Sequence, residues 1–230
     1  MNKEMKVKSA PRETSSADQT RVALVHAALK LFGRQGFDGT STREIAAEAK
    51  ANIGSIAYHF GGKEGLRIAA ADFIVETIQG IAGQAVGGPA PANREAARTQ
   101  LLGALERMAG FVVASPQAGE IVQFVLRELS HPTAALDRIY AGVFEPTHRR
   151  LCQIWEQATG EPAESEATKL TVFTMIGQVI YFRIGREAVL RRMGWREIGK
   201  AEAAKVVAVA TGNLKAMLAA RDATRKEGTS

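Results

Sequence analysis

A stretch running from Ser41 to Phe60, STREIAAEAKANIGSIAYHF, limits the fold of this chain more than any other segment. Ser41 or Thr40 can cap a first short helix, because a hydroxyl there accepts a hydrogen bond from an amide of the first turn, and Glu44 completes a capping box. After a tight turn, Asn52 can cap a second short helix. Two short helices joined in this way indicate a helix-turn-helix, whose second helix fits the DNA major groove.

Four short motifs between residues 20 and 68 are more specific than this helix pattern. They are Ala28-x-x-Leu31-Phe32-x-x-x-Gly36-Phe37, Thr42-x-x-x-Ile45-Ala46, Gly54-Ser55-Ile56-x-Tyr58-His59-Phe60 and Lys63-Glu64-x-Leu66. Together they resemble the DNA-binding domain of the TetR family of bacterial repressors. The resemblance implies a small three-helix head that binds double-stranded DNA.

Composition fits a globular DNA-binding protein. The chain has 230 residues, is 46% hydrophobic and carries a net charge of +6, which suits a polyanionic partner. Its single cysteine, Cys152, excludes an internal disulfide and fits a reducing compartment. The longest apolar run, Leu170 to Phe182, is too short to span a bilayer, and the first residues are polar. We therefore expect a cytoplasmic protein without a membrane segment.

Glycine and proline breaks divide the rest of the chain into helices, and no run alternates long enough for a sheet. The sequence thus predicts an all-α fold: a flexible basic arm (1–17), a helix-turn-helix domain (18–65) and a larger helical effector-binding and dimerisation domain (66–230). Pro146 should kink the helix that contains it. Besides the helix-turn-helix, we expect helices over residues 18–34, 63–86, 93–114, 121–129, 133–159, 164–192 and 196–221.

Residue types assign contacts at the DNA end. Thr42 and Arg43 begin the first helix of the motif, where a hydroxyl, free amides and a guanidinium can meet phosphate or base. The start of the second helix contacts base edges in such motifs, and its end can contact the phosphates. For Ile53 and Ile56, packing is favoured over contact with thymine methyl groups. The predicted DNA-binding residues are Thr42, Arg43, Asn52, Gly54, Ser55, Tyr58, His59 and Lys63.

Two departures from the TetR pattern stand in the second helix. Many TetR proteins have Lys where Ile53 stands and Tyr where Ala57 stands. Neither replacement can make the same phosphate contact, so these two contacts are not transferred to this chain.

The helix expected at residues 164–192 is apolar nearly all round, so it must be covered on two sides. One side can face the chain's own core and the other a second subunit, and the TetR resemblance implies the same homodimer. A large monomeric core is the alternative. The predicted dimer-interface residues are Ile176, Val179, Val207, Leu214 and Leu218.

The body also carries motifs of its own, Arg127-Glu128-Leu129-x-x-Pro132-Thr133-Ala134, Ile139-Tyr140, Pro146 and Ile176-Gly177-Gln178. They resemble the C-terminal domain of CecR-type TetR regulators, which implies a repressor that responds to a small drug-like or toxic organic compound. From the two-fold symmetric pair of heads in the expected homodimer, we expect an inverted-repeat operator. No cofactor is expected. Aromatic and amide groups on interior helices suit such a ligand, although each is also a good core residue. The predicted effector contacts are Phe111, Phe124, Tyr140, Phe173, Gln178 and Tyr181.

A different class of protein competes with this interpretation. Glu128-x-x-His131 and Glu145-x-x-His148 have the spacing of di-iron carboxylate bundles, which would make the body an enzyme or a metal-responsive regulator. Prolines follow His131 and Glu145 and disfavour the helical geometry that the motif needs. We therefore expect no catalytic residue and no metal site.

Overall fold

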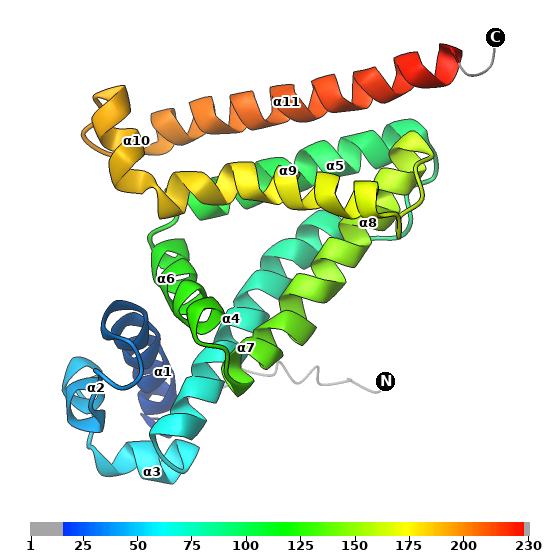
Figure 1. Cartoon of the computed structure of the whole chain (residues 1–230). Coiled ribbons are helices and arrows are strands. Elements are labelled where there is room, and N and C mark those ends of the chain that lie inside the picture. Colours follow the sequence, from blue (N-terminus) through cyan, green and yellow to red (C-terminus); the bar gives the residue numbers. More distant parts are fainter. Residues whose placement is uncertain (1–15, 228–230) are drawn as a thin grey trace, which may run out of the picture.

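The computed structural model describes residues 16–227, and every regular element in that range is a helix (Figure 1). The predicted all-α fold is confirmed; most of the predicted basic arm, residues 1–15, lies outside the described residues. The elements are α1 (Ser16–Gln35), α2 (Thr42–Glu48), α3 (Gly54–Phe60), α4 (Lys63–Val86), α5 (Arg94–Ala109), η1 (Gly110–Ala114), α6 (Pro116–Ser130), α7 (Ala134–Ile139), η2 (Tyr140–Phe144), α8 (Glu145–Thr159), α9 (Glu166–Ile184), α10 (Arg186–Met193) and α11 (Lys200–Glu227), where η marks a π-helical turn.

The predicted capping box starts α2. The Glu44 backbone N–H donates to the Ser41 hydroxyl oxygen at 3.1 Å, and the Ser41 N–H donates to the Glu44 carboxylate at 2.7 Å. Thr40 has a different role: it is buried, and its hydroxyl donates to the Gly36 carbonyl at 2.7 Å. Ser41 is therefore the cap, and Thr40 fixes the loop before it.

The head does not have a core of its own. Phe32 of α1 packs in one apolar cluster with Ile121 and Phe124 of α6 and Ile139 of α7. A methyl group at Gly33 would lie 3.2 Å from both the Cβ of Gln123 and the backbone nitrogen of Phe124, so α1 and α6 approach closely there. The predicted boundary between residues 65 and 66 is thus crossed by continuous packing from α1 to α6 and α7.

A second cluster holds the body together. It joins α5, α8, α9 and α11 around the fully buried Trp155, whose indole N–H donates to Glu161 at 2.7 Å. In Figure 1, α9 and α11 run along the end of the molecule opposite to α2 and α3. The two opposite ends of the molecule are therefore formed by different helices: α2 and α3 at one end, α9 and α11 at the other.

Three predicted helices are interrupted in the structure. The segment predicted as one helix over 93–114 is α5 followed by the π-helical turn η1. The segment predicted as one helix over 133–159 is α7, the turn η2 and α8, with Pro146 in the first turn of α8. The π-helical turn ends just before Pro146, where a straight helix would lack a hydrogen bond. The segment predicted over 164–192 breaks at Gly185, which lies outside the helical region at φ −88° and ψ 19°. The last helix begins at Lys200, four residues later than predicted.

Among the described residues, one helix is long and apolar enough to cross a membrane by length and composition, α11 between Lys200 and Ala223. The segments Arg94–Ala114 and Pro116–Ser130 meet the same criterion only as a pair, and they are bent by 89°. Only 33% of the apolar window of α11 is buried in the chain. This helix thus leaves apolar surface for something else to cover.

Candidate nucleic-acid interface

Helix α3 is anchored on one side and open on the other. Ile56 is 2% exposed in the cluster of α1 and α4, whereas Tyr58 is 84% exposed. Gly61, at φ 72°, ends the helix and donates its N–H to the Ala57 carbonyl at 3.0 Å. The exposed positions of the turn and helix are Asn52, Ile53, Gly54, Ala57 and Tyr58.

Asn52 was predicted to cap α3, but the N-cap position is Ile53, and Asn52, one residue earlier, forms an Asx-type bond instead. Its side-chain carbonyl accepts the Gly54 N–H at 2.8 Å. Lys50, two residues earlier, takes the left-handed conformation at φ 51°, which turns the chain from α2 into α3. The Asn52 amide –NH₂ is therefore the hydrogen-bonding group that this side chain can still offer to a ligand.

The predicted phosphate contacts lie around α3. Tyr58 is largely exposed, and His59 is half-buried with its ring edge-on to Tyr58 at a centroid distance of 4.9 Å. The Lys63 ammonium lies 4.2 Å from the centre of the Phe37 ring. On α2, Arg43 is exposed. Seven of the eight predicted DNA-binding residues thus lie on α2, α3 and the turn between them, and Lys63 begins α4. Four of the eight are half-buried: Thr42, Ser55, His59 and Lys63.

A close backbone contact fixes how α3 meets α4. A Cβ built on Gly65 would lie 1.9 Å from the Phe60 carbonyl oxygen, which is far inside van der Waals contact. Only glycine allows the last residue of α3 to sit against the first turn of α4 in this way. The sequence contains this glycine in its Lys63-Glu64-x-Leu66 motif, but the pattern gave no role to the position.

The Arg127-Glu128 motif holds the head onto the body. Arg127 donates to the carbonyls of Gly33 and Arg34 at the end of α1, at 3.4 and 3.1 Å. Glu128 is 2% exposed, and its carboxylate accepts from Arg67 at 2.8 Å and from the Thr133 hydroxyl at 2.5 Å. Both carboxylate oxygens of Glu128 are therefore engaged by protein donors.

The predicted effector contacts do not line one cavity in the described part of the chain. Phe124 is buried in the cluster shared by α1 and α6, and Phe111 is half-buried between the two clusters. Three others are more than half exposed: Tyr140, Phe173 and Tyr181. The structure thus separates residues that the sequence grouped, and contact between any one of them and an effector stays a prediction.

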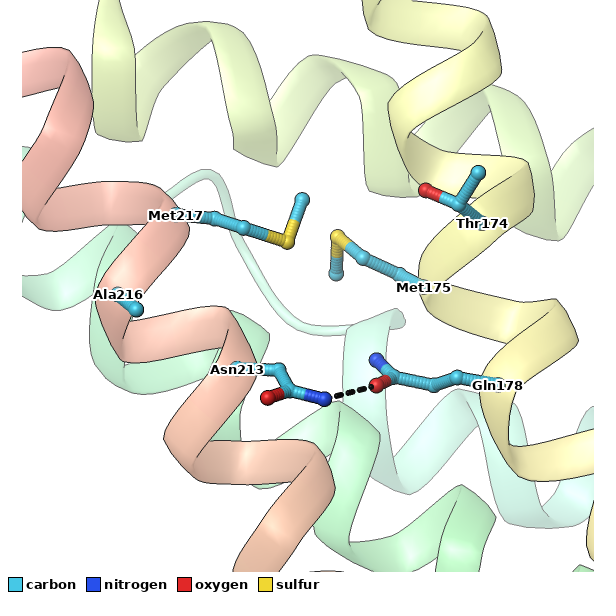
Figure 2. A pocket seen from close by; sticks show the side chains of 6 residues that line it. All are labelled: Thr174, Met175, Gln178, Asn213, Ala216 and Met217. Carbon is cyan, nitrogen blue, oxygen red and sulfur yellow. Dashed lines mark hydrogen bonds between the residues drawn. The ribbon is translucent and has the colours of Figure 1, made fainter.

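The sixth candidate, Gln178, lies in an open groove of about 470 Å³ between α9 and α11 (Figure 2). Its side-chain oxygen accepts a hydrogen bond from the Asn213 amide at 3.0 Å. Met175 and Met217 extend toward each other across the groove. Thr174 and Ala216 complete the lining.

Three of the five predicted dimer-interface residues were assigned wrongly. Val179, Leu214 and Leu218 are at most 4% exposed in the single chain, so they belong to its own core. Ile176 and Val207 are half-buried against the same core. A helix that is apolar all round does not reveal in its sequence which face turns inward. The exposed apolar residues of α9 are instead Leu170, Phe173, Tyr181 and Ile184.

Comparison with known proteins agrees with both ends of this architecture. Residues 24–70 match the family model described as bacterial regulatory proteins, tetR family. Residues 97–221 match the model for the C-terminal domain of the HTH-type transcriptional dual regulator CecR. The chain belongs to the TetR family of transcriptional regulators.

Curated relatives support the CecR type of this family. The chain is 35% identical over 192 residues to the HTH-type transcriptional dual regulator CecR of Shigella flexneri, covering 80% of this chain and 85% of that protein. It is 32% identical over 135 residues to the regulatory protein RaaS of Mycobacterium tuberculosis, covering 57% and 63%. The resemblance that the sequence motifs indicated is confirmed.

Solved structures share the fold. A transcriptional regulator from Pseudomonas aeruginosa PAO1 superposes with a TM-score of 0.65 at 20% identity, over 89% of this chain and 93% of that one. AibR, solved in complex with isovaleryl coenzyme A and operator DNA, superposes with a TM-score of 0.64 at 17% identity, over 84% and 96%. At this identity the likeness concerns the fold alone.

Membership of the TetR family excludes the enzyme alternative, since the family and the relatives are transcriptional regulators. The structure also shows why the Glu128-x-x-His131 spacing is misleading: Glu128 is bound to Arg67 and Thr133, while His131 is exposed after the end of α6.

The TetR-family head differs from expectation at one site. Ile53, for which packing was favoured, is 49% exposed and belongs to neither described apolar cluster.

Proposed function

We propose that this TetR-family chain is a homodimeric repressor that binds an inverted-repeat operator and is released by a small organic effector. The observation that carries the proposal is the separation of two surfaces. The exposed face of α3 lies at one end of the molecule, and exposed apolar surface of α9 and α11 lies at the other. A chain built this way can bind DNA at one end and a second copy at the other.

The exposed surface of α9 supports a dimer. Leu170, Phe173, Tyr181 and Ile184 recur three, eight and three residues apart, which places them on one stripe of a helix, and each is more than half exposed. Val209 of the neighbouring helix α11 is 63% exposed. A two-fold axis beside these helices would cover the same patch on both copies.

A dimer explains how two short recognition helices read DNA. Two symmetric heads contact two half-sites about one helical turn, or roughly 34–36 Å, apart, so the operator repeats with inverted symmetry. Tethering the second head to the first multiplies the affinity without any new contact. Cytoplasmic localisation is part of this proposal, since the operator is chromosomal DNA.

For the effector to release the protein from DNA, it need only bind more tightly to the conformation in which the spacing of the two heads does not fit the operator. A preference of about 100-fold corresponds to roughly 2.7 kcal/mol. The contacts of α6 with the head support such coupling, because Arg127 of α6 hydrogen-bonds to α1 and Glu128 of α6 hydrogen-bonds to Arg67 of α4. The AibR structure, solved with isovaleryl coenzyme A and operator DNA, shows that a fold of this kind holds both a ligand and DNA.

The proposal is tested with the DNA upstream of the chain's own gene. Light scattering after size exclusion measures the mass of the free protein, and footprinting on the upstream fragment locates the bound sequence. A dimer that protects an inverted repeat supports the proposal. A monomer, or protection of a single unrepeated site, contradicts the dimeric mode of binding. A reporter placed behind the same fragment distinguishes repression from activation.

A further inference from the structure

We propose that Ile53 reads the 5-methyl group of thymine in the major groove, so that each half-site carries a thymine at the start of α3. This inference rests on the proposed function and concerns how the same surface chooses its DNA sequence.

The recognition segment lacks the side chains that usually read guanine. Between Lys50 and Lys63 the chain contains no Arg, Lys, Asp or Glu. A guanidinium or ammonium forms the commonest specific contact to guanine, and a carboxylate accepts from cytosine. Base reading from α3 and the turn before it therefore falls to hydroxyl, amide, imidazole and apolar groups.

The amide available on this helix discriminates weakly. The Asn52 carbonyl already accepts the Gly54 N–H at 2.8 Å, and the –NH₂ group that remains can donate to adenine N7, guanine N7 or O6, or thymine O4. The Ser55 hydroxyl donates or accepts and fits several bases as well. Neither group alone selects one base pair.

Ile53 has no structural role that explains its position. It stands at the N-cap of α3, where its aliphatic side chain can accept no capping hydrogen bond; the Gly54 N–H is accepted by the Asn52 side chain instead. It is 49% exposed and lies outside both described clusters, whereas Ile56 anchors the helix at 2% exposed. An aliphatic side chain is thus exposed to solvent at the N-terminal end of α3, the end that contacts base edges in helix-turn-helix motifs.

The major groove offers one apolar partner for such a side chain. Thymine alone among the four bases carries a methyl group on that edge. Ala57, four residues later and also exposed, extends the apolar surface along the helix.

The test removes the methyl group from the DNA and the side chain from the protein. DNA duplexes that bind wild-type protein are first selected from a pool of random sequences. Each thymine of an enriched half-site is then replaced by uracil, which pairs identically but lacks the methyl group, and affinity is measured by fluorescence anisotropy. Burying one such group changes affinity by roughly four-fold. We expect one uracil position per half-site to weaken wild-type binding by about that factor, and Ile53→Ala to be insensitive at that position.

Val22→Ala is the matched control. Val22 is a branched aliphatic residue that is 51% exposed on α1, and its variant should keep the uracil sensitivity of the wild type. If wild-type protein binds thymine and uracil duplexes equally at every position, the inference is overturned, although DNA binding itself is intact. An Ile53→Ala variant that still binds the uracil duplex more weakly than the thymine duplex also overturns the inference. If wild-type protein enriches no duplex, the proposed function fails, and this inference fails with it.

Discussion

Arg67 and Glu128 form a buried ion pair that joins the two halves of the molecule. The Arg67 guanidinium on α4 lies 2.8 Å from the Glu128 carboxylate on α6, and the two side chains are 11% and 3% exposed. The same guanidinium lies 4.5 Å from the centre of the Phe37 ring in the loop between α1 and α2. One side chain of α4 thus touches both the head and the body.

Removing the carboxylate of this pair should destabilise the protein strongly. Glu128→Ala leaves Arg67 buried and unpaired, which costs about 3–5 kcal/mol. Urea unfolding at one fixed protein concentration measures the change in the free energy of unfolding. The control is Arg138→Ala, which removes an exposed pair with Asp72 at 4.0 Å and should cost less than about 1 kcal/mol. Similar losses in the two variants would show that the buried pair contributes little.

Gly65→Ala should abolish operator binding while the body stays folded. The added methyl group has no room beside the Phe60 carbonyl, so α3 must shift relative to α4. Gly80→Ala, on the same helix with nothing within 4 Å of the new Cβ, should instead stabilise the protein by up to about 1 kcal/mol and bind DNA normally. Gel-shift titrations and circular dichroism on the two variants check this, and equal DNA binding would contradict the role assigned to Gly65.

Lys63→Ala should weaken binding to all DNA sequences and lower the salt dependence. A lost phosphate contact reduces the slope of log K against log salt by roughly 0.9. Tyr58→Phe, which removes only a largely exposed hydroxyl, should weaken binding without changing sequence preference. Lys169→Ala in the body, where Lys169 pairs with Glu164 at 2.8 Å, is the control and should leave the slope unchanged. A slope that Lys63→Ala does not alter would remove this residue from the phosphate contacts.

A carboxylate placed on the exposed surface of α9 or α11 should split the dimer. Leu170→Glu and Val209→Glu would each bury an unpaired charge on both copies, at a cost of several kcal/mol per dimer. The single chains should stay folded, since both side chains are more than half exposed. Light scattering measures the mass, and Val22→Glu on α1 is the control that should stay dimeric. If both variants keep the dimer mass, the interface lies elsewhere.

The start of α2 should loosen in acid. Hydrogen bonds from the backbone and then the side chain of Ser41 hold the pKa of Glu44 below its ordinary value of 4.5. The carboxylate therefore stabilises the folded state above that ordinary value, and the contribution is lost as pH falls through the lower pKa of the folded state. NMR titration of the Glu44 carboxyl carbon measures this pKa. Ser41→Ala removes the hydroxyl but keeps the backbone donor, so the pKa should rise part of the way to 4.5; an unchanged value would exclude the hydroxyl contribution.

The sequence by itself determined the local structure of the head. Ser41 and Glu44 form the predicted capping box, and Gly61 ends α3, because capping and turn formation depend on residues within a few positions of each other. Asn52 forms a local Asx-type bond before α3 in place of the predicted cap. Helix α4 has the predicted bounds for the same reason. The TetR motifs lie in this region, and the family was therefore readable from the sequence.

Only the tertiary structure decided which apolar faces turn inward. Leu214 and Val179 appeared to be interface residues and are core, whereas Ile53 was expected to pack and is half-exposed. The pairing of Glu128 with Arg67, sixty-one positions earlier, also depends on contacts between distant segments. Periodicity identifies a helix that is apolar on several sides, but the neighbours that cover each side are fixed by long-range packing, which no local pattern contains.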